Sequence, residues 1–293
     1  MTNYYRFDDI PDHHRLDLLL PQQQIYGKKT GFETEEQAAA EDAERVRLLG
    51  GTERKEAVAL ARRLGEEKVP QTMASSRFMR DARLNFGASL LGALEPWPLE
   101  QIRLVTQLPR SGEVRAKDLM DQDPRVHLER FRQQINRTDP GNGSGFLISV
   151  LEAELEPNSG LLRFHTHGAA IGSYIDRLHE LQDRCAYSAR EHVKRPLQLN
   201  SLKDDESRAP AVSYLLKSYW KQRRIGPVGQ TGIIKRERKG HRVGEPYHTD
   251  MLLWLDRHRV ADLTLFMGCR MRNSMIVLTD PELSAPYTTR TLT

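Results

Sequence analysis

The sequence predicts an α+β fold in which an antiparallel β-sheet carries flanking helices, with a helical N-terminal section before it. Apolar and polar residues alternate along residues 101–108, as they do in strands, and residues 145–168 have the pattern of a β-hairpin with a central turn. Apolar residues recur at helical spacing between these strands and in a longer polar stretch that precedes them. The resulting order of strand, helix, hairpin, helix, strand and helix is typical of an α+β domain.

The composition indicates a polar, soluble protein. Charged residues make up 29% and apolar residues 38% of the 293 residues. No window approaches the roughly 18 apolar residues that a membrane helix needs. The N-terminus lacks the basic and apolar segments of a secretory signal, and the chain has only two cysteines, Cys185 and Cys269. We therefore expect a cytoplasmic protein without a membrane partner.

The first expected section covers residues 1–95 and is helical. Thr34 and Gln37 are spaced as a capping box at the start of a long helical pattern. Two adjacent glycines at positions 50 and 51 interrupt this pattern, which favours a helical hairpin or a surface for a partner. A Pro-Trp-Pro sequence then ends the section.

The second expected section covers residues 96–225 and contains the alternating elements. Phe131 and Ile135 fall on the inner face of its first helix, and Pro210 opens its last helix. The third section, residues 226–293, is expected to be a basic extension. The elements expected in the second section are a strand at 101–108, a helix at 125–137, a hairpin at 145–168, a helix at 173–195, a strand at 196–202 and a helix at 209–224.

The hairpin is expected to bring two histidines and a carboxylate onto one face of the sheet. His165 and His167 share a face because successive side chains of a strand point to opposite sides. If residues 157–160 form the turn, Glu152 lies opposite His165. A register shifted by two residues would still place a glutamate beside the histidines. The pattern therefore leaves the choice open among Glu152, Glu154 and Glu156.

Two imidazoles and one carboxylate form a metal site in outline. This ligand set leaves coordination positions open, which suits a hard or borderline divalent ion that must also bind substrate oxygens. A closed structural zinc site would need more ligands. The plainer alternative is that His165 and His167 are two polar residues on a solvated strand face.

The helix expected at 209–224 presents a tyrosine beside lysines. One arc of the helix is apolar and should pack inward, and the opposite side carries Tyr214, Lys217 and Lys221. Two ammonium groups beside a phenol favour its ionised form and make it a better nucleophile. The alternative is that Tyr214 is a surface aromatic residue packed on its own helix. The residues of the apolar arc are Val212, Leu215, Leu216 and Tyr219.

Basic residues are concentrated between positions 221 and 242. This stretch contains eight lysines and arginines and a single acid, Glu237. Such a block indicates contact with a polyanion, and we expect a DNA backbone; a solvated loop is the alternative. The eight residues are Lys221, Arg223, Arg224, Lys235, Arg236, Arg238, Lys239 and Arg242.

Residues 101–224 resemble the HUH endonuclease superfamily, and in particular its rolling-circle replication initiators (the Rep type). Three motifs occur in the family's order: a threonine-containing strand at 104–108, the pair His165-Thr166-His167, and Tyr-x-x-Lys at Tyr214 to Lys217. The resemblance implies an antiparallel sheet with a ferredoxin-like or RRM-like core. It also implies a metal site made of His165, His167 and Glu152.

The resemblance further implies an activity. Mg²⁺ or Mn²⁺ would polarise a scissile phosphate, Tyr214 would attack phosphorus to form a 5′-phosphotyrosine, and Lys217 would orient the phosphate. The expected substrate is single-stranded or hairpin origin DNA, and host replication proteins are further expected partners. The expected role is to initiate rolling-circle replication of a plasmid or phage, although a transposase or a conjugative relaxase would share the same core.

Two other functions fit parts of the pattern. His165 and His167 followed by Ser173 and Asp176 resemble the zinc-binding pattern of JAMM metalloproteases, but the spacer of five residues is about two too short and Gly168 replaces the usual proline. A non-catalytic DNA-binding regulator would use the basic block alone. Substitution of Tyr214 by phenylalanine separates these functions, because only the nuclease forms a covalent adduct.

Overall fold

A computed structural model describes residues 24–25, 28–29, 32–139, 144–184, 187–189, 193–217, 219–227, 234–237, 239–272 and 275–279. Within them the chain is an α+β protein built on one eight-stranded sheet. Among these residues, no helix combines the length and the apolar character needed to cross a membrane.

The described part of residues 1–95 contains three helices, α2 (Glu35–Gly50), α3 (Lys55–Leu64) and α4 (Ser76–Leu94). The predicted capping box is confirmed, because Thr34 and Gln37 exchange backbone-to-side-chain hydrogen bonds at the start of α2. Asp42 of α2 accepts hydrogen bonds from the backbone and side chains at the start of α4. This buried carboxylate therefore fixes α2 against α4.

The centre of the sheet is the hairpin of β5 (Gly145–Glu156) and β6 (Leu161–Gly172). On the β6 side follow β3 (Ile102–Gln107) and β7 (Leu197–Ser201), and β4 (Glu113–Arg115) pairs with the start of β6. On the β5 side, β12 (Thr264–Met267) pairs with the first half of β5, and β8 (Lys221–Gln222) pairs with the second half and leads to β11 (His241–Arg242).

The sheet is mixed, and the prediction of a wholly antiparallel sheet needs this correction. All its pairs are antiparallel except the parallel pair of β5 and β8. Elsewhere in the described ranges, three short two-stranded ladders occur: β1 (Gln24–Ile25) with β2 (Lys28–Lys29), β9 (Ile225–Pro227) with β10 (Ile234–Arg236), and β13 (Cys269–Arg272) with β14 (Met275–Leu278).

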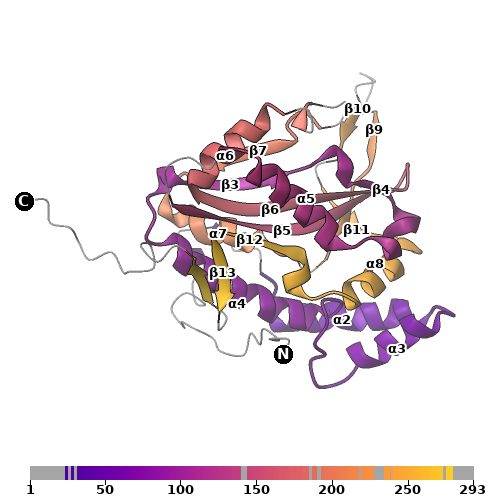
Figure 1. Cartoon of the computed structure of the whole chain (residues 1–293). Helices are drawn as coiled ribbons and strands as arrows, with labels where there is room; N and C mark the ends of the chain where they lie inside the picture. The colour runs from indigo at the N-terminus through magenta and orange to yellow at the C-terminus, as the bar shows by residue number, and fades with distance from the viewer. Residues whose placement is uncertain are drawn as a thin grey trace, which may run out of the picture.

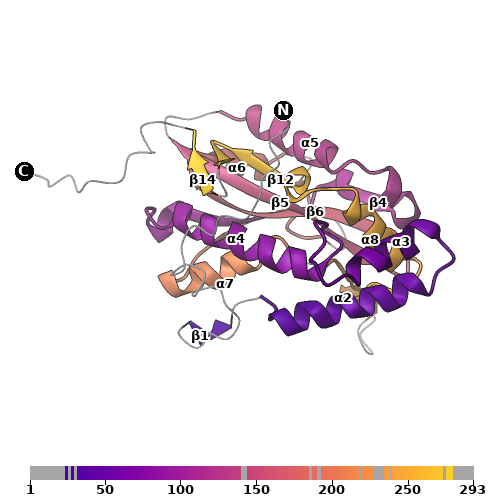
Figure 2. The same ribbon diagram turned by 90° about the horizontal axis from the view of Figure 1, so that it is seen from below.

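Helices cover both faces of the sheet. Figure 2 shows β5 and β6 between a layer that contains α5 (Pro124–Asn136) and α6 (Ser173–Gln182) and a layer that contains α4 and α7 (Arg208–Ser213). Helix α8 (Tyr247–Asp256) lies at the end of the sheet nearest α3 (Figure 1). Because of this double cover, every residue of β5 is buried.

One hydrophobic core connects the helices to the sheet. Its buried residues run from Phe32 to Met271 and come from all three expected sections of the chain. Phe131 and Ile135 of α5 are fully buried in it, as the helical spacing predicted. A smaller cluster joins α3 to α8 through Leu60 and Leu253.

Two predicted helices are shorter than their sequence patterns. Helix α6 ends at Gln182 rather than at 195, and Cys185 lies outside the described residues. The prediction of a helix over 209–224 is wrong beyond Ser213, where α7 ends. Leu216 has a positive φ of 53°, which ends helical geometry, and Lys221 pairs with Glu154 of β5. The backbone must therefore be extended by position 221.

Candidate metal centre

The β5–β6 ladder places the acid and the histidines as the hairpin pattern predicted. Glu152 pairs with His165, Val150 pairs with His167, and Glu154 pairs with Arg163. The turn between Glu156 and Leu161 sets this register. The three side chains point to the face of the sheet that α7 covers, because they alternate with residues such as Phe164 that face α5.

Glu152, His165 and His167 form a buried cluster that could bind a metal ion. One ligand atom from each residue lies within 4.8 Å of the others. The Nε2 atoms of His165 and His167 lie 3.7 Å and 3.8 Å from Oε2 of Glu152. All three residues are at most 8% exposed. The donor set is two imidazole nitrogens and a carboxylate, which suits borderline divalent ions.

Hydrogen bonds to Nδ1 orient both imidazoles. Nδ1 of His165 donates to the carbonyl oxygen of Arg163 at 3.0 Å, because a carbonyl can only accept. Nδ1 of His167 lies 3.0 Å from Oγ1 of Thr106, which faces His167 across the β3–β6 ladder. These contacts leave Nε2 of each ring as the ligand atom, as is usual when a second group fixes the other ring nitrogen of a metal-binding histidine.

The protonation states of the cluster also suit a cation. Burial lowers the pKa of His165, and it lowers the pKa of His167 to about 3, so both rings are neutral near pH 7. Burial alone would raise the pKa of Glu152, but nearby positive charge, chiefly that of Lys217, outweighs it, so the pKa of this carboxyl is below its usual value. Metal ions bind neutral imidazoles and ionised carboxylates.

The second carboxylate oxygen of Glu152 also indicates that the cluster suits a metal ion. Oε1 of Glu152 is buried and has no hydrogen-bond partner among the described residues. A buried carboxylate oxygen without a partner is costly unless a ligand satisfies it. The other two glutamates are engaged elsewhere, since Glu154 pairs with Arg223 and Glu156 accepts backbone hydrogen bonds from the hairpin turn. The structure thus brings Glu152, and not its neighbours, to the histidines.

Tyr214 and Lys217 lie beside the cluster, although not on a helix as predicted. Tyr214 is the C-cap residue that directly follows α7, and Lys217 lies three residues farther on, outside any helix. The ring centroids of Tyr214 and His167 are 5.0 Å apart, in an edge-on arrangement. Nζ of Lys217 lies 2.6 Å from Oε2 of Glu152 and 4.1 Å from the centroid of the Tyr214 ring. Tyr214 is 50% exposed, so its ring borders both the cluster and the solvent.

Two expectations about this segment are wrong. Lys221 does not join Tyr214 and Lys217, because it lies in β8 and its Nζ is 5.6 Å from the Tyr219 ring centroid. Tyr219 was expected to pack inward, but it is 42% exposed and Trp220 is buried in its place. Both errors follow from the end of α7, because the wheel positions no longer apply after Ser213.

Sequence reasoning missed the contact of Thr106 with His167. The motif at 104–108 drew attention to this strand, but the pairing of Thr106 with His167 requires β3 to lie beside β6 in that register. No local pattern reveals such a neighbour. Asp176, which the protease alternative requires, lies in the first turn of α6 and is not one of the three residues of the cluster.

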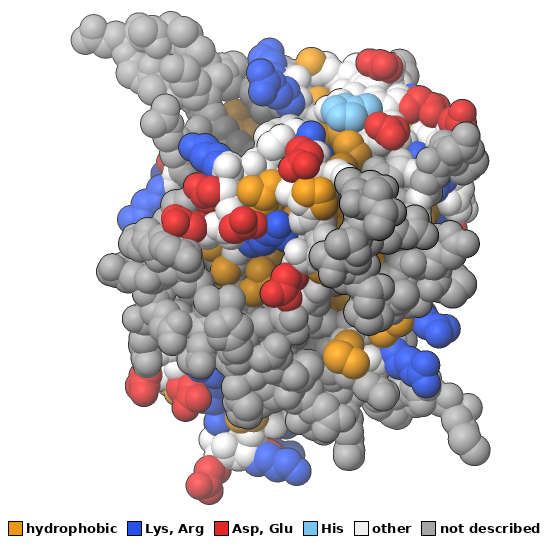
Figure 3. Space-filling view, turned by 90° about the vertical axis from the view of Figure 1, so that its left-hand side faces the viewer, with side chains coloured by type: hydrophobic (Ala, Val, Ile, Leu, Met, Phe, Trp, Pro, Cys, Tyr) orange, Lys and Arg blue, Asp and Glu red, His pale blue; other side chains and the backbone are white. Residues whose placement is uncertain are grey.

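The basic block does not form a set of free cations. Arg223 pairs with Glu154 at 3.3 Å and Arg242 pairs with Glu41 at 2.5 Å. Arg224 and Lys239 are exposed and Lys221 is half-buried. Lys235 and Arg236 lie in β10, and Arg238 lies outside the described residues. The left-hand side of the molecule, away from β10 and β11, likewise carries intermixed acidic and basic side chains among its described residues (Figure 3).

Comparisons with protein-family models, with curated proteins and with solved structures found no match to this chain. The fold and the site together define an α+β protein with a buried glutamate-histidine-histidine cluster that could bind a metal ion. The side chains around that cluster are therefore what distinguishes one activity from another.

Proposed function

We propose that this protein is a metal-dependent nuclease of the HUH type that nicks and rejoins single-stranded DNA through a phosphotyrosine intermediate, and that it initiates rolling-circle replication of a plasmid or phage. The observation that carries the proposal is the position of Tyr214, whose half-exposed ring is 5.0 Å from the ring of His167. A phenol with a lysine beside it, at the edge of a candidate metal centre, is the arrangement that nucleophilic attack on a phosphate requires.

The proposed ion is Mn²⁺ or Mg²⁺, held by His165, His167 and Glu152. One carboxylate and two imidazoles leave several coordination positions for substrate oxygens. When bound, the ion would act as a Lewis acid toward the scissile phosphate. Mn²⁺ tolerates nitrogen ligands better than Mg²⁺ does, so it is the ion of choice for a first assay.

The residues of the chain supply the rest of the reaction. The phenolic oxygen of Tyr214 forms a bond to phosphorus while the bond from phosphorus to the 3′-oxygen breaks. Tyr214 loses its proton to solvent, which reaches the half-exposed ring, and the departing 3′-oxygen gains a proton. Lys217 holds a positive charge between Glu152 and the phenol ring, where charge develops on the phosphate. The reverse reaction rejoins the strand.

Two ion-paired arginines lie beside the cluster on the same face of the hairpin. Arg163 lies opposite Glu154 in the ladder, two residues before His165, and Arg223 pairs with Glu154. Nε of Arg163 and Nε of Arg223 are buried without a hydrogen-bond partner among the described residues, although each is in an ion pair. Because these Nε atoms are buried against Glu113 and Glu154, the two arginines neutralise those acids and add no free charge for a DNA strand.

The test uses single-stranded oligonucleotides with hairpins, Mn²⁺ and denaturing electrophoresis. A 5′-phosphotyrosine joins the protein to the fragment on the 3′ side of the nick. Oligonucleotides labelled at the 3′ end should therefore shift with the protein, and those labelled at the 5′ end should be shortened without a shift. Chelation of the metal should abolish both products. The same label pattern without the metal, or with the labels exchanged, would exclude the proposed reaction.

The matched variants are Tyr214→Phe and Tyr219→Phe. Both tyrosines are exposed to a similar extent, but only Tyr214 lies beside the cluster. Tyr214→Phe should keep DNA binding and lose the covalent product, and Tyr219→Phe should keep both. Binding without an adduct in the unmodified protein would instead indicate a non-catalytic DNA-binding regulator.

A further inference from the structure

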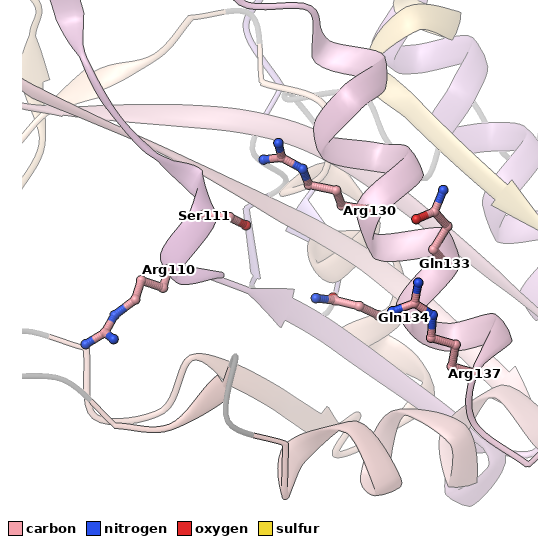
Figure 4. Close-up of a pocket in the computed structure, with 6 residues that line it drawn as sticks. All are labelled: Arg110, Ser111, Arg130, Gln133, Gln134 and Arg137. Carbon is pink, nitrogen blue, oxygen red and sulfur yellow. The ribbon is translucent and has the colours of Figure 1, made fainter.

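A hollow lies beside α5, on the face of the sheet opposite the metal cluster. It has a volume of about 530 Å³, within the range of small-molecule sites. Its lining includes three arginines and no acid. Figure 4 shows Arg130 and Gln134 extending from α5 toward the turn that carries Ser111, with Arg137 at the C-cap of the same helix. The lining residues are Arg110, Ser111, Arg130, Gln133, Gln134 and Arg137.

The arginines of this site differ from the other arginines of α5. Arg125 pairs with Asp262 at 2.6 Å and Arg132 pairs with Glu129 at 3.3 Å. Among the described residues, no acid forms an ion pair with Arg110, Arg130 or Arg137. Arg130 and Arg137 place two like charges on the side of α5 that lines the hollow, and Arg110, whose side chain extends away from α5 (Figure 4), adds a third at its edge. An anionic ligand would offset the repulsion among these charges.

A hydrogen-bond chain fixes the direction of the Gln134 amide. The hydroxyl of Thr166 donates to Gln107 at 3.3 Å, the amide of Gln107 donates to the Tyr187 oxygen at 3.0 Å, and the Tyr187 hydroxyl donates to Oε1 of Gln134. Burial raises the pKa of Tyr187 to about 12, so it remains a donor. The Gln134 oxygen is thus occupied, and its NH₂ group remains to donate into the site.

We propose that this site binds a chain of linked phosphates, as in a nucleoside triphosphate or inorganic triphosphate. Arg130 and Arg137 are seven residues apart, which is about 10 Å along a helix, so their guanidinium groups suit an extended anion better than a single phosphate. Guanidinium, amide and hydroxyl donors are the groups that bind phosphate oxygens. The site lies across the sheet from Tyr214 and does not depend on the proposed nuclease.

The test measures binding of ATP and of inorganic tripolyphosphate by titration calorimetry in the presence of EDTA, which keeps the metal centre out of the measurement. Both ligands should bind, and binding should weaken as salt rises. Arg130→Gln and Arg137→Gln should each lower the affinity about tenfold, as expected for a lost charge-assisted hydrogen bond. Binding of tripolyphosphate alone would indicate recognition of the phosphates without a base, and binding of ATP alone would indicate a nucleotide site; either result supports the proposal.

The control is Arg132→Gln, an exposed arginine of the same helix that does not line the site. This variant should bind both ligands as the unmodified protein does. The proposal is overturned if neither ligand binds at millimolar concentration, or if the Arg130 and Arg137 variants bind as tightly as the control. It is also overturned if the site binds only oligonucleotides, since it would then belong to a DNA surface.

Discussion

Nζ of Lys217 lies 2.6 Å from Oε2 of Glu152, the oxygen that also faces Nε2 of His165 and His167. A divalent ion bound by Glu152, His165 and His167 would therefore share the Glu152 carboxylate with the ammonium group of Lys217. The buried carboxylate needs a positive partner, because an unpaired charge in the interior is costly. Lys217 supplies that partner. A metal ion would compete with the Lys217 ammonium group for Oε2 of Glu152, so the ion pair lowers the affinity of the cluster for the metal.

Lys217→Met should make the free energy of unfolding depend more strongly on bound metal. Loss of the ammonium leaves Glu152 buried without a counter-charge, so the free energy of unfolding without metal should fall by about 3 kcal/mol. Mn²⁺ at about 100 times its Kd should restore about 2.7 kcal/mol. Thermal unfolding with and without Mn²⁺ measures both effects, and Mn²⁺ should stabilise this variant more than the unmodified protein. An equal gain in both proteins would show that the ion does not meet Glu152.

Thr106→Val should weaken metal binding without removing a ligand. Oγ1 of Thr106 is 3.0 Å from Nδ1 of His167, and loss of such a supporting contact typically lowers metal affinity about 10-fold to 100-fold. Calorimetric titration with Mn²⁺ checks this. Thr166→Val is the matched control, because Thr166 lies between the two histidines but bonds to Gln107 on the other face. If both variants lose the same affinity, a general disturbance of β6 explains the loss.

Local features of the sequence were sufficient to predict the hairpin and its register. The two-residue period and a turn at residues 157–160 together determine which side chains share a face, and Glu152 does pair with His165. The capping box at Thr34 and Gln37 is also local, since its partners are three residues apart. These predictions needed no knowledge of distant parts of the chain.

Features that depend on distant neighbours could not be predicted in the same way. The sequence from 209 to 224 has helical spacing, but the second half of β5 has an unpaired edge that β8 fills from position 221. Tyr214 and Lys217 still meet, through a turn rather than one helix face. The arginine-lined site likewise joins Arg110 to α5 across the fold, and no spacing in the sequence indicates it.

Gly168→Ala should destabilise the hairpin next to the metal ligands. A Cβ atom at position 168 would lie 2.0 Å from the carbonyl oxygen of Ile148, so the strands would have to move apart. We expect the free energy of unfolding to fall by about 2 kcal/mol, as for other overpacked sites. Gly244→Ala is the control, since no atom lies within 4 Å of its added Cβ. Urea denaturation of both variants checks the difference, and equal stability of the two would contradict the close strand contact.

His127→Gln should flatten the pH dependence of stability in mildly acidic solution. Burial against Phe164, with Arg130 nearby, lowers the pKa of His127 from 6.5 to about 4. Between these two pH values the unfolded chain binds a proton at His127 and the folded protein does not, so the free energy of unfolding decreases as the pH falls from 6.5. Glutamine takes up no proton. The number of protons taken up on unfolding, which the slope of this free energy against pH measures, should therefore fall by about one. Urea denaturation at several pH values in this interval measures the slope. Loss of the stacking contact lowers stability equally at every pH, so only an unchanged slope would contradict the assignment.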